Sequence, residues 1–145
     1  MRPFTLEQPT SPADASQLHA EQFPRARYIA GGTDLLAQVK EGTLRAQTLV
    51  SLANLPEMSG IESNDDGLDI GALVTLTELA ESAAVRQVCD VLAKAALSVA
   101  SPQIRNVGTI GGNLCQRPRC WYFRSHLYYC RKKGGETCYA FGEQN

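Results

Sequence analysis

Four cysteines near the C-terminal end of the chain have the type and number of ligands that a metal centre requires. The chain has five cysteines, and four of them are Cys115, Cys120, Cys130 and Cys138. Four thiolates are the ligand count of a [4Fe–4S] cluster. The gaps of four, nine and seven residues contain no C-x2-C pair, which counts against zinc without excluding it. In a reducing compartment such thiols are better interpreted as ligands than as disulfides.

Basic residues are concentrated around these cysteines. Residues 115–145, the cysteine segment, carry 6 basic and 2 acidic side chains, whereas residues 1–114 carry 8 basic and 13 acidic ones. Nearby cations would stabilise an anionic cluster and raise its reduction potential. Trp121, Tyr122 and Phe123 either shield such a centre or simply pack under the loop, and His126 is expected to be exposed to solvent rather than a ligand. Nucleic-acid binding through these aromatics is disfavoured because the rest of the chain is acidic.

A first glycine pair, Gly31-Gly32, joins a short predicted strand to a predicted helix over residues 34–41. Glycines at this position allow backbone N–H groups to approach a phosphate, and the helix dipole favours negative charge there. Thr33 is expected either to cap the helix or to donate its hydroxyl to a ligand. The loop lacks the third glycine of the Rossmann fingerprint and the Gly-Lys-Ser/Thr of a P-loop. An ordinary glycine-containing turn therefore stays open as an alternative.

A second glycine pair, Gly111-Gly112, lies between Thr109 and Asn113. It again offers close backbone approach, a hydroxyl and an amide. Two such loops on two lobes would suit a ligand with a pyrophosphate centre and long arms. Composition alone does not choose that ligand.

The pattern around these loops predicts an α+β protein in three parts: residues 1–55, 56–114 and 115–145. Residues 25–55 are expected to form a strand, a helix ending at Gly42 and a second, parallel strand. A hairpin is predicted around the turn at residues 64–67 and a short helix over residues 75–82. A longer helix is expected over residues 85–99, and beyond Asn113 no regular element is predicted. The apolar face of the helix over residues 85–99 is formed by Val85, Val88, Cys89, Leu92, Ala95, Ala96 and Val99. Cys89 is therefore expected to be a buried apolar residue.

No apolar run is long enough to cross a bilayer, and residues 1–12 contain no hydrophobic segment of a secretory signal. The expected location is cytoplasmic, or periplasmic only as the passenger of a signal-bearing partner.

Three segments in order, residues 28–35, 69–75 and 102–113, resemble the FAD-binding subunit of the molybdenum hydroxylases, the xanthine dehydrogenase and carbon monoxide dehydrogenase family. This resemblance implies a flavin domain of the vanillyl-alcohol-oxidase (PCMH) type that binds FAD. The first loop would hold the pyrophosphate, the second would lie against the cofactor, and Ala100 would lie near its flavin end. The implied contacts are Arg27, Tyr28, Ile29, Ala30, Gly31, Gly32, Thr33, Asp34, Leu35, Ala100, Thr109, Gly112 and Asn113.

The cysteine segment is similar to an insertion in the 4-hydroxybenzoyl-CoA reductase and periplasmic aldehyde oxidoreductase branches of this family. That similarity implies an extra [4Fe–4S] cluster held by Cys115, Cys120, Cys130 and Cys138. Family members run to about twice this length, which implies that the chain is truncated within its flavin domain.

By resemblance, the chain would relay electrons between iron–sulfur clusters, FAD and an external acceptor. Its partners would be a molybdenum-cofactor subunit and a [2Fe–2S] subunit in a heterotrimeric complex. No catalytic side chain is predicted, because the protein's share would be to hold and tune cofactors. Two alternatives stay open: a non-enzymatic iron–sulfur or zinc module with vestigial flavin loops, and a scaffold that only docks to a molybdenum subunit.

Overall fold

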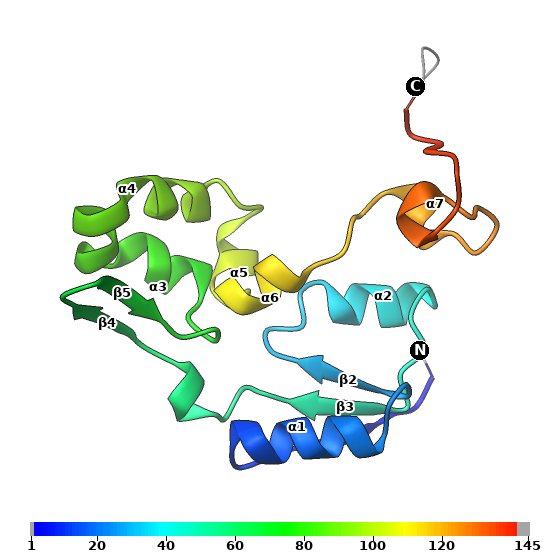
Figure 1. Cartoon of the computed structure of the whole chain (residues 1–145), viewed down its shortest axis with the longest axis horizontal. Helices are drawn as coiled ribbons and strands as arrows, with labels where there is room; N and C mark the ends of the chain where they lie inside the picture. The colour runs from blue at the N-terminus through cyan, green and yellow to red at the C-terminus, as the bar shows by residue number, and fades with distance from the viewer. Residues whose placement is uncertain (1, 142–145) are drawn as a thin grey trace.

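A three-stranded parallel sheet forms the first unit of the computed structural model, which describes residues 2–141 (Figure 1). Its strand order is β1 (Thr5–Glu7), β3 (Thr48–Ser51) and β2 (Ala26–Ile29). Both outer strands pair in parallel with β3. The predicted parallel return from the second strand to the third is therefore confirmed, and β3 is buried because it has a neighbour on each side.

Two helices cover opposite faces of this sheet (Figure 1). Helix α1 (Pro12–Glu21) buries Ala15 against Ala26 and Val50, and Ser11 caps it by accepting the N–H of Asp14. Helix α2 (Leu35–Glu41) lies on the other face and ends, as predicted, at a left-handed glycine. Strand β2 and helix α2 fix the two ends of the loop between them, residues 30–34.

The second unit consists of a hairpin covered by two helices. Strands β4 (Ile61–Asn64) and β5 (Gly67–Ile70) pair antiparallel around the predicted turn. Helices α3 (Leu76–Glu81) and α4 (Ala83–Leu97) bury a separate hydrophobic core that also receives apolar side chains of the hairpin. The predicted hairpin and both predicted helices are thus present, with ends shifted by one or two residues.

Short helical elements connect the units and shape the C-terminal part. The 3-10 turn η1 (Pro56–Met58) leads from the sheet to the hairpin. Helices α5 (Pro102–Arg105) and α6 (Ile110–Cys115) lie between the two units (Figure 1). The cysteine segment contains α7 (Trp121–Arg124) and the 3-10 turn η2 (Arg131–Lys133), so the prediction that nothing regular follows Asn113 was wrong.

The long helix differs from its predicted form. Cys89 has φ −148° and ψ 69°, so α4 is kinked there rather than continuous, and Cys89 is only half-buried. Val88 and Ala95, expected on the apolar face, are exposed, while Ala93 is buried in their place. A uniform helical period across residues 85–99 could not anticipate this, because the kink interrupts the period.

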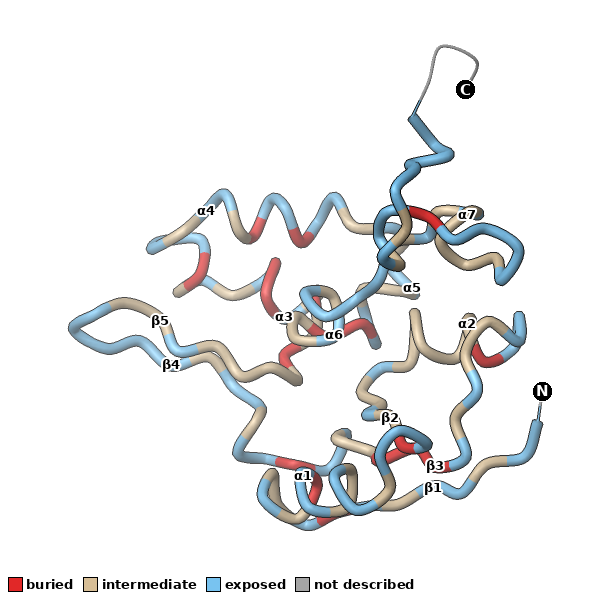
Figure 2. The backbone as a smooth tube through the Cα atoms, turned by 45° about the vertical axis from the view of Figure 1, so that its right-hand side comes forward, coloured by how far each residue is buried: buried red, intermediate tan, exposed pale blue. Residues whose placement is uncertain are grey.

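The cysteine segment lies above α2 and has almost no core of its own. Figure 2 shows it largely exposed, whereas buried residues gather in the two units. Cys130 is the one buried hydrophobic residue among the described positions of this segment. Such a segment has to be ordered by something other than burial of apolar surface.

Candidate functional site

The two glycine loops meet at a single pocket with a volume of about 390 Å³. This volume lies within the range of pockets that bind small molecules and cofactors. We call it the loop pocket. All thirteen residues predicted to contact the ligand line it: Arg27, Tyr28, Ile29, Ala30, Gly31, Gly32, Thr33, Asp34, Leu35, Ala100, Thr109, Gly112 and Asn113.

The two glycines of the first loop serve different geometric needs. A Cβ on Gly31 would overlap the carbonyl oxygen of Val107, so glycine is needed for the first loop to touch the segment that precedes the second. Gly32 has φ 73°, in the left-handed region that other residues avoid. A Cβ there would also approach Leu36 Cδ1 to 2.9 Å. The pair therefore joins the two units and turns the chain into α2.

The first loop presents unpaired donors to the pocket. The backbone N–H groups of Gly31, Gly32 and Thr33 donate to no acceptor within residues 2–141, and the Thr33 hydroxyl has no partner there either. Of the two roles expected for Thr33, it does not take that of capping the helix: the N-cap is Asp34, whose side chain makes no capping bond. Successive backbone N–H groups in a turn form a concavity that binds anions. This cradle fits a diphosphate.

The second loop is built differently. Its glycines begin α6, where Thr109 caps the helix by accepting the N–H of Gly112 at 3.1 Å. The N–H of Gly111 donates to Ala72, and that of Asn113 donates to Thr109, both at backbone oxygens. These donors are satisfied within the protein. The second loop thus forms the opposite wall of the loop pocket, and its N–H groups are not a second anion cradle.

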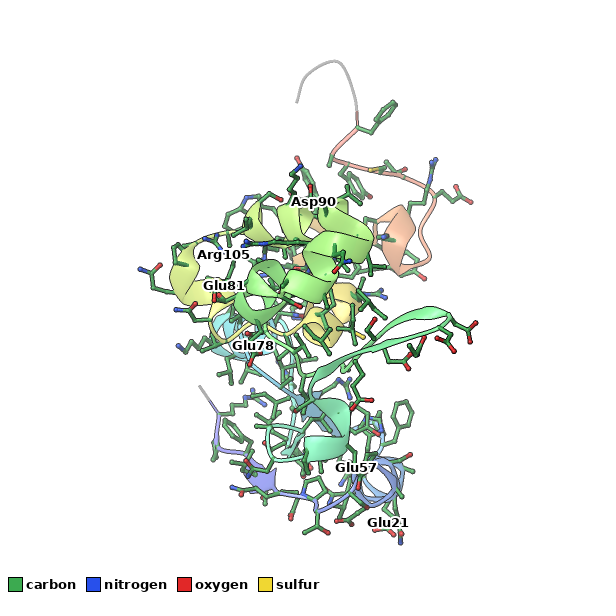
Figure 3. The ribbon with its side chains drawn as sticks, turned by 90° about the vertical axis from the view of Figure 1, so that its left-hand side faces the viewer. Glu21, Glu57, Glu78, Glu81, Asp90 and Arg105 are labelled. Carbon is green, nitrogen blue, oxygen red and sulfur yellow. The ribbon has the colours of Figure 1, made fainter. Side chains whose placement is uncertain are left out.

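A bridge to α3 holds this wall in place. Thr75 and Thr109 form an isolated antiparallel bridge, and Thr75 also caps α3 in a reciprocal capping box with Glu78. The Thr75 backbone N–H, followed by its hydroxyl, lowers the pKa of the Glu78 carboxyl below its ordinary value. Figure 3 labels Glu78 on α3.

Ala100 occupies a strained position in the pocket lining. Its φ of 44° is the only positive φ of a non-glycine residue within the described chain. The guanidinium of Arg105, labelled in Figure 3, donates to the carbonyl oxygen of Val99 at 2.9 Å and to that of Ala100 at 3.4 Å. Left-handed backbone at a residue with a Cβ is found preferentially at ligand-binding and active sites.

The charged residues of the first loop are held by the protein itself. Arg27 Nη1 donates to the carbonyl oxygens of Pro24 and Ala26 at 2.7 and 2.6 Å. Asp34 Oδ1 accepts Arg124 Nη2 at 2.8 Å, and side-chain exposure is only 17% and 13% for the two residues. Arg124 belongs to the cysteine segment, so this ion pair joins that segment to the loop pocket.

The four predicted metal ligands do not gather in one place. Cys120, Cys130 and Cys138 line a second hollow of about 800 Å³, which we call the cysteine hollow, whereas Cys115 lines the loop pocket. Within residues 2–141, no three His, Cys, Asp or Glu side chains come close enough together to hold a metal ion. The arrangement therefore brings three of the cysteines to one cavity without forming a ligand set.

Basic side chains order the backbone of the cysteine segment. Arg124 Nε donates to the carbonyl oxygen of Pro118, and Lys133 Nζ donates to those of Tyr122 and Ser125. Arg131 likewise donates from Nε and Nη2 to the carbonyl oxygen of Glu136. Three of the six cations thus stabilise the backbone of the segment. From the sequence they were expected instead to stabilise an anionic cluster.

The aromatic residues of this segment divide into two groups. Tyr122, Tyr128 and Tyr139 contact one another, with ring centroids 5.0 to 5.7 Å apart. Tyr122 and Phe123 line the cysteine hollow, whereas Trp121 is 87% exposed and is not among the residues that line it. Packing under the loop accounts for the tyrosines, and Trp121 does not shield the hollow.

Sequence reasoning missed several residues of the loop pocket. Ile104 and Gly108 were inside a segment already singled out, and Cys115 had been assigned to the metal centre. Arg117 and Arg119 follow the second loop closely enough to suggest themselves. The remaining residues come from elements whose positions depend on the tertiary fold. The full set of additional lining residues is Gln38, Leu44, Leu76, Val99, Ile104, Gly108, Cys115, Gln116, Arg117 and Arg119.

Residues 2–120 match the model of the FAD binding domain in molybdopterin dehydrogenase. This match spans both glycine loops and most of the described chain. The chain belongs to this family. The family resemblance inferred from the three sequence segments is thereby confirmed.

Two curated relatives match different shares of this chain. The aldehyde oxidoreductase FAD-binding subunit PaoB of Escherichia coli (strain K12) is 42% identical over 142 residues, 97% of this chain and 44% of that protein. The xanthine dehydrogenase FAD-binding subunit of Escherichia coli O157:H7 is 44% identical over 104 residues, 71% of this chain and 35% of that protein. The chain thus spans less than half the length of these relatives, and the match to PaoB includes the cysteine segment.

Solved structures confirm the predicted α+β flavin-domain fold. A carbon monoxide dehydrogenase from Hydrogenophaga pseudoflava aligns with a TM-score of 0.76 and 33% identity, covering 78% of this chain and 39% of that one. Quinoline 2-oxidoreductase from Pseudomonas putida 86 aligns with a TM-score of 0.73 and 33% identity, covering 77% and 39%. Across residues 2–141, no helix has the length and apolar character needed to span a membrane.

Proposed function

We propose that this chain binds FAD in the loop pocket and serves as an electron-transfer part of a molybdenum-containing oxidoreductase of the aldehyde or xanthine type. The observation that carries the proposal is the row of unpaired N–H groups at Gly31, Gly32 and Thr33, three residues that line a pocket walled by both glycine loops. Family membership and the names of the relatives support the same cofactor.

In this proposal the chain holds and orients the cofactor. The first loop binds the diphosphate through its backbone N–H groups and the Thr33 hydroxyl, and the wall formed by Thr109, Gly112 and Asn113 contacts the cofactor from the other side. FAD would supply the capacity to accept and release electrons. The strained backbone at Ala100 lies in the part of the lining where the family resemblance expects the flavin end. No side chain is assigned a proton-transfer role.

We further propose that the cysteine segment binds a [4Fe–4S] cluster through Cys115, Cys120, Cys130 and Cys138. Support comes from the ligand count, from the three cysteines that share the cysteine hollow and from the extent of the match to PaoB. As they stand, the four thiols do not form a ligand set.

The proposed partners are a molybdenum-cofactor subunit and a [2Fe–2S] subunit, in a heterotrimer in the cytoplasm. The relatives support this because they are FAD-binding subunits and, in the carbon monoxide dehydrogenase of Hydrogenophaga pseudoflava, a medium chain. Assembly would bring the electron source and the flavin into one complex.

A second candidate function, a metal-binding module without a flavin site, is favoured by the cysteine hollow alone. Anaerobic reconstitution with iron and sulfide, followed by titration with FAD, separates the two. The flavin proposal predicts saturable FAD binding with or without iron. Cluster absorbance without any flavin uptake would instead establish the module and exclude the proposed function for this chain.

A further inference from the structure

The start of the cysteine segment reaches into the loop pocket. Gln116, Arg117 and Arg119 line the same pocket as the first loop, although they follow the second loop in sequence. Arg117 and Arg119 therefore belong to the surroundings of any molecule bound there. Cys115 also lines this pocket, whereas the cavity-lining residues from Cys120 onward belong to other cavities.

The glycine loops contribute a single cation, Arg27, to this pocket. Its Nη1 is already engaged by two backbone carbonyl oxygens, and the Asp34 carboxylate is paired with Arg124. Backbone N–H groups can satisfy phosphate oxygens, but they carry only partial charges. A diphosphate bound by the first loop alone would therefore keep part of its negative charge unpaired.

Arg117 and Arg119 have N–H donors available to bind that negative charge. Arg119 makes no hydrogen bond or ion pair with any residue from 2 to 141. Arg117 lies over the Phe123 ring at 5.2 Å from its centroid, which engages the face of the guanidinium and leaves its N–H edges available. A guanidinium presents several N–H donors in a geometry that matches phosphate oxygens.

A fixed anchor holds the backbone between these two arginines. The Pro118 carbonyl oxygen accepts Arg124 Nε at 3.3 Å, and the same guanidinium is paired with Asp34 at 2.8 Å and with Glu41 at 3.3 Å. Residues 117–119 are thus held beside α2 by one side chain that also contacts the first loop. Arg117 and Arg119 consequently extend from a positioned stretch of backbone.

We propose that Arg117 and Arg119 form the cationic wall of the FAD site and bind the cofactor's diphosphate opposite the first loop. This inference rests on the proposed function and assigns part of the FAD site to the cysteine segment. The segment then has a role in flavin binding that is separate from any metal centre, because neither arginine is a metal ligand.

The test compares ligands with and without a diphosphate on the full 145-residue chain. FAD, ADP and riboflavin are titrated by calorimetry into the unchanged chain, the double variant Arg117→Gln/Arg119→Gln and the control Lys132→Gln. Lys132 is an exposed cation of the same segment that lines the cysteine hollow and not the loop pocket. The double variant should bind FAD and ADP about tenfold or more weakly, as expected for lost charged hydrogen bonds. Riboflavin binding and Lys132→Gln should be unaffected.

Each other outcome has a definite meaning. Unchanged FAD affinity in the double variant would overturn this inference and leave the proposed function standing. Equal weakening of riboflavin and FAD binding would also overturn it. Losing a contact to the diphosphate cannot weaken the binding of riboflavin, which has no diphosphate. Absence of FAD binding by the unchanged chain would overturn the proposed function itself. The variant Arg117→Lys/Arg119→Lys keeps both charges but not the planar guanidinium, so it should recover part of the affinity. That recovery distinguishes loss of charge from misfolding.

Discussion

Gly31 and Gly32 are neighbours in sequence but are required for unrelated reasons. Gly31 allows the first loop to touch the backbone of Val107 in the other unit, whereas Gly32 supplies a left-handed turn. The sequence indicated a phosphate-binding loop from the pair as a whole. It could not distinguish the two roles, because the contact that demands Gly31 comes from a residue far along the chain.

Substitution of Gly31 by alanine should therefore lower both stability and FAD affinity. The added Cβ forces the two loops apart, at a cost of about 1–3 kcal/mol for an overpacked contact. The free energy of unfolding in urea and a parallel FAD titration measure the two effects.

Gly60→Ala is the matched control for this change. Gly60 has φ 96° but open space around its Cβ position, so alanine there costs only about 1–2 kcal/mol of backbone strain and should leave FAD binding unchanged. If Gly31→Ala proved as stable as the unchanged chain, the loop contact would not be structurally important.

The cysteines are predicted to differ in their effect on bound iron. Cys89 lies at the kink of α4, away from both cavities that contain the other four. After anaerobic reconstitution, serine at Cys115, Cys120, Cys130 or Cys138 should reduce the iron content, and Cys89→Ser should not. An equal loss of iron at Cys89 would contradict the ligand assignment.

At the scale of elements, a single guanidinium attaches α7 to α2. Arg124 is paired with Asp34, 90 residues earlier in the chain, and both side chains are largely buried. No sequence pattern reveals a contact over that separation. The sequence could identify a segment that lacks a core but not the residue that anchors it.

Arg124→Gln should release the start of the cysteine segment from α2. Loss of the ion pair leaves Asp34 without its charged partner, so local opening becomes easier. Hydrogen exchange should become about tenfold faster across residues 116–125 and stay unchanged in the parallel sheet. The exposed Lys132→Gln again serves as the control, and equal protection in both variants would show that the segment is held by other contacts.

The capping box of α3 makes a pH-dependent contribution to stability. Because the folded pKa of Glu78 is lowered, chiefly by the Thr75 backbone N–H, its contribution is present at neutral pH. It should be lost as the pH falls below the ordinary glutamate value of 4.5 and through the lower folded value.

Unfolding experiments from pH 7 to 3 can test this contribution. The variant Glu78→Gln should lose less stability than the unchanged chain over the acid range. Identical pH profiles for the two proteins would contradict the predicted linkage.

How far the elements could be predicted depended on the strength of their local signals. The hairpin turn, the short helix over residues 75–82 and the glycine after α2 are encoded by neighbouring residues, and all were identified. Helix α1 was missed because only Ala15 is buried in it, which leaves no apolar stripe. Its Ser11-Pro12 start was nevertheless a recognisable helix signal. Strand β1 has only three residues, too few for an alternating pattern.

At the scale of the whole molecule, the candidate site exists only where two units with separate cores meet. The sequence and its family resemblance named thirteen residues that all line the loop pocket. They did not reveal that the N–H groups of the second loop are satisfied within the protein, or that Arg117 and Arg119 line the pocket as well. Both facts follow from packing between distant segments.

The central claim is that the loop pocket binds FAD, and direct titration of the 145-residue chain with FAD tests it. We predict saturable binding of one FAD per chain. We also predict marked weakening in Gly32→Val, because a branched side chain at a left-handed position distorts the anion cradle. Failure of the folded, unchanged chain to bind FAD, or equal affinity in Gly32→Val, would contradict the account.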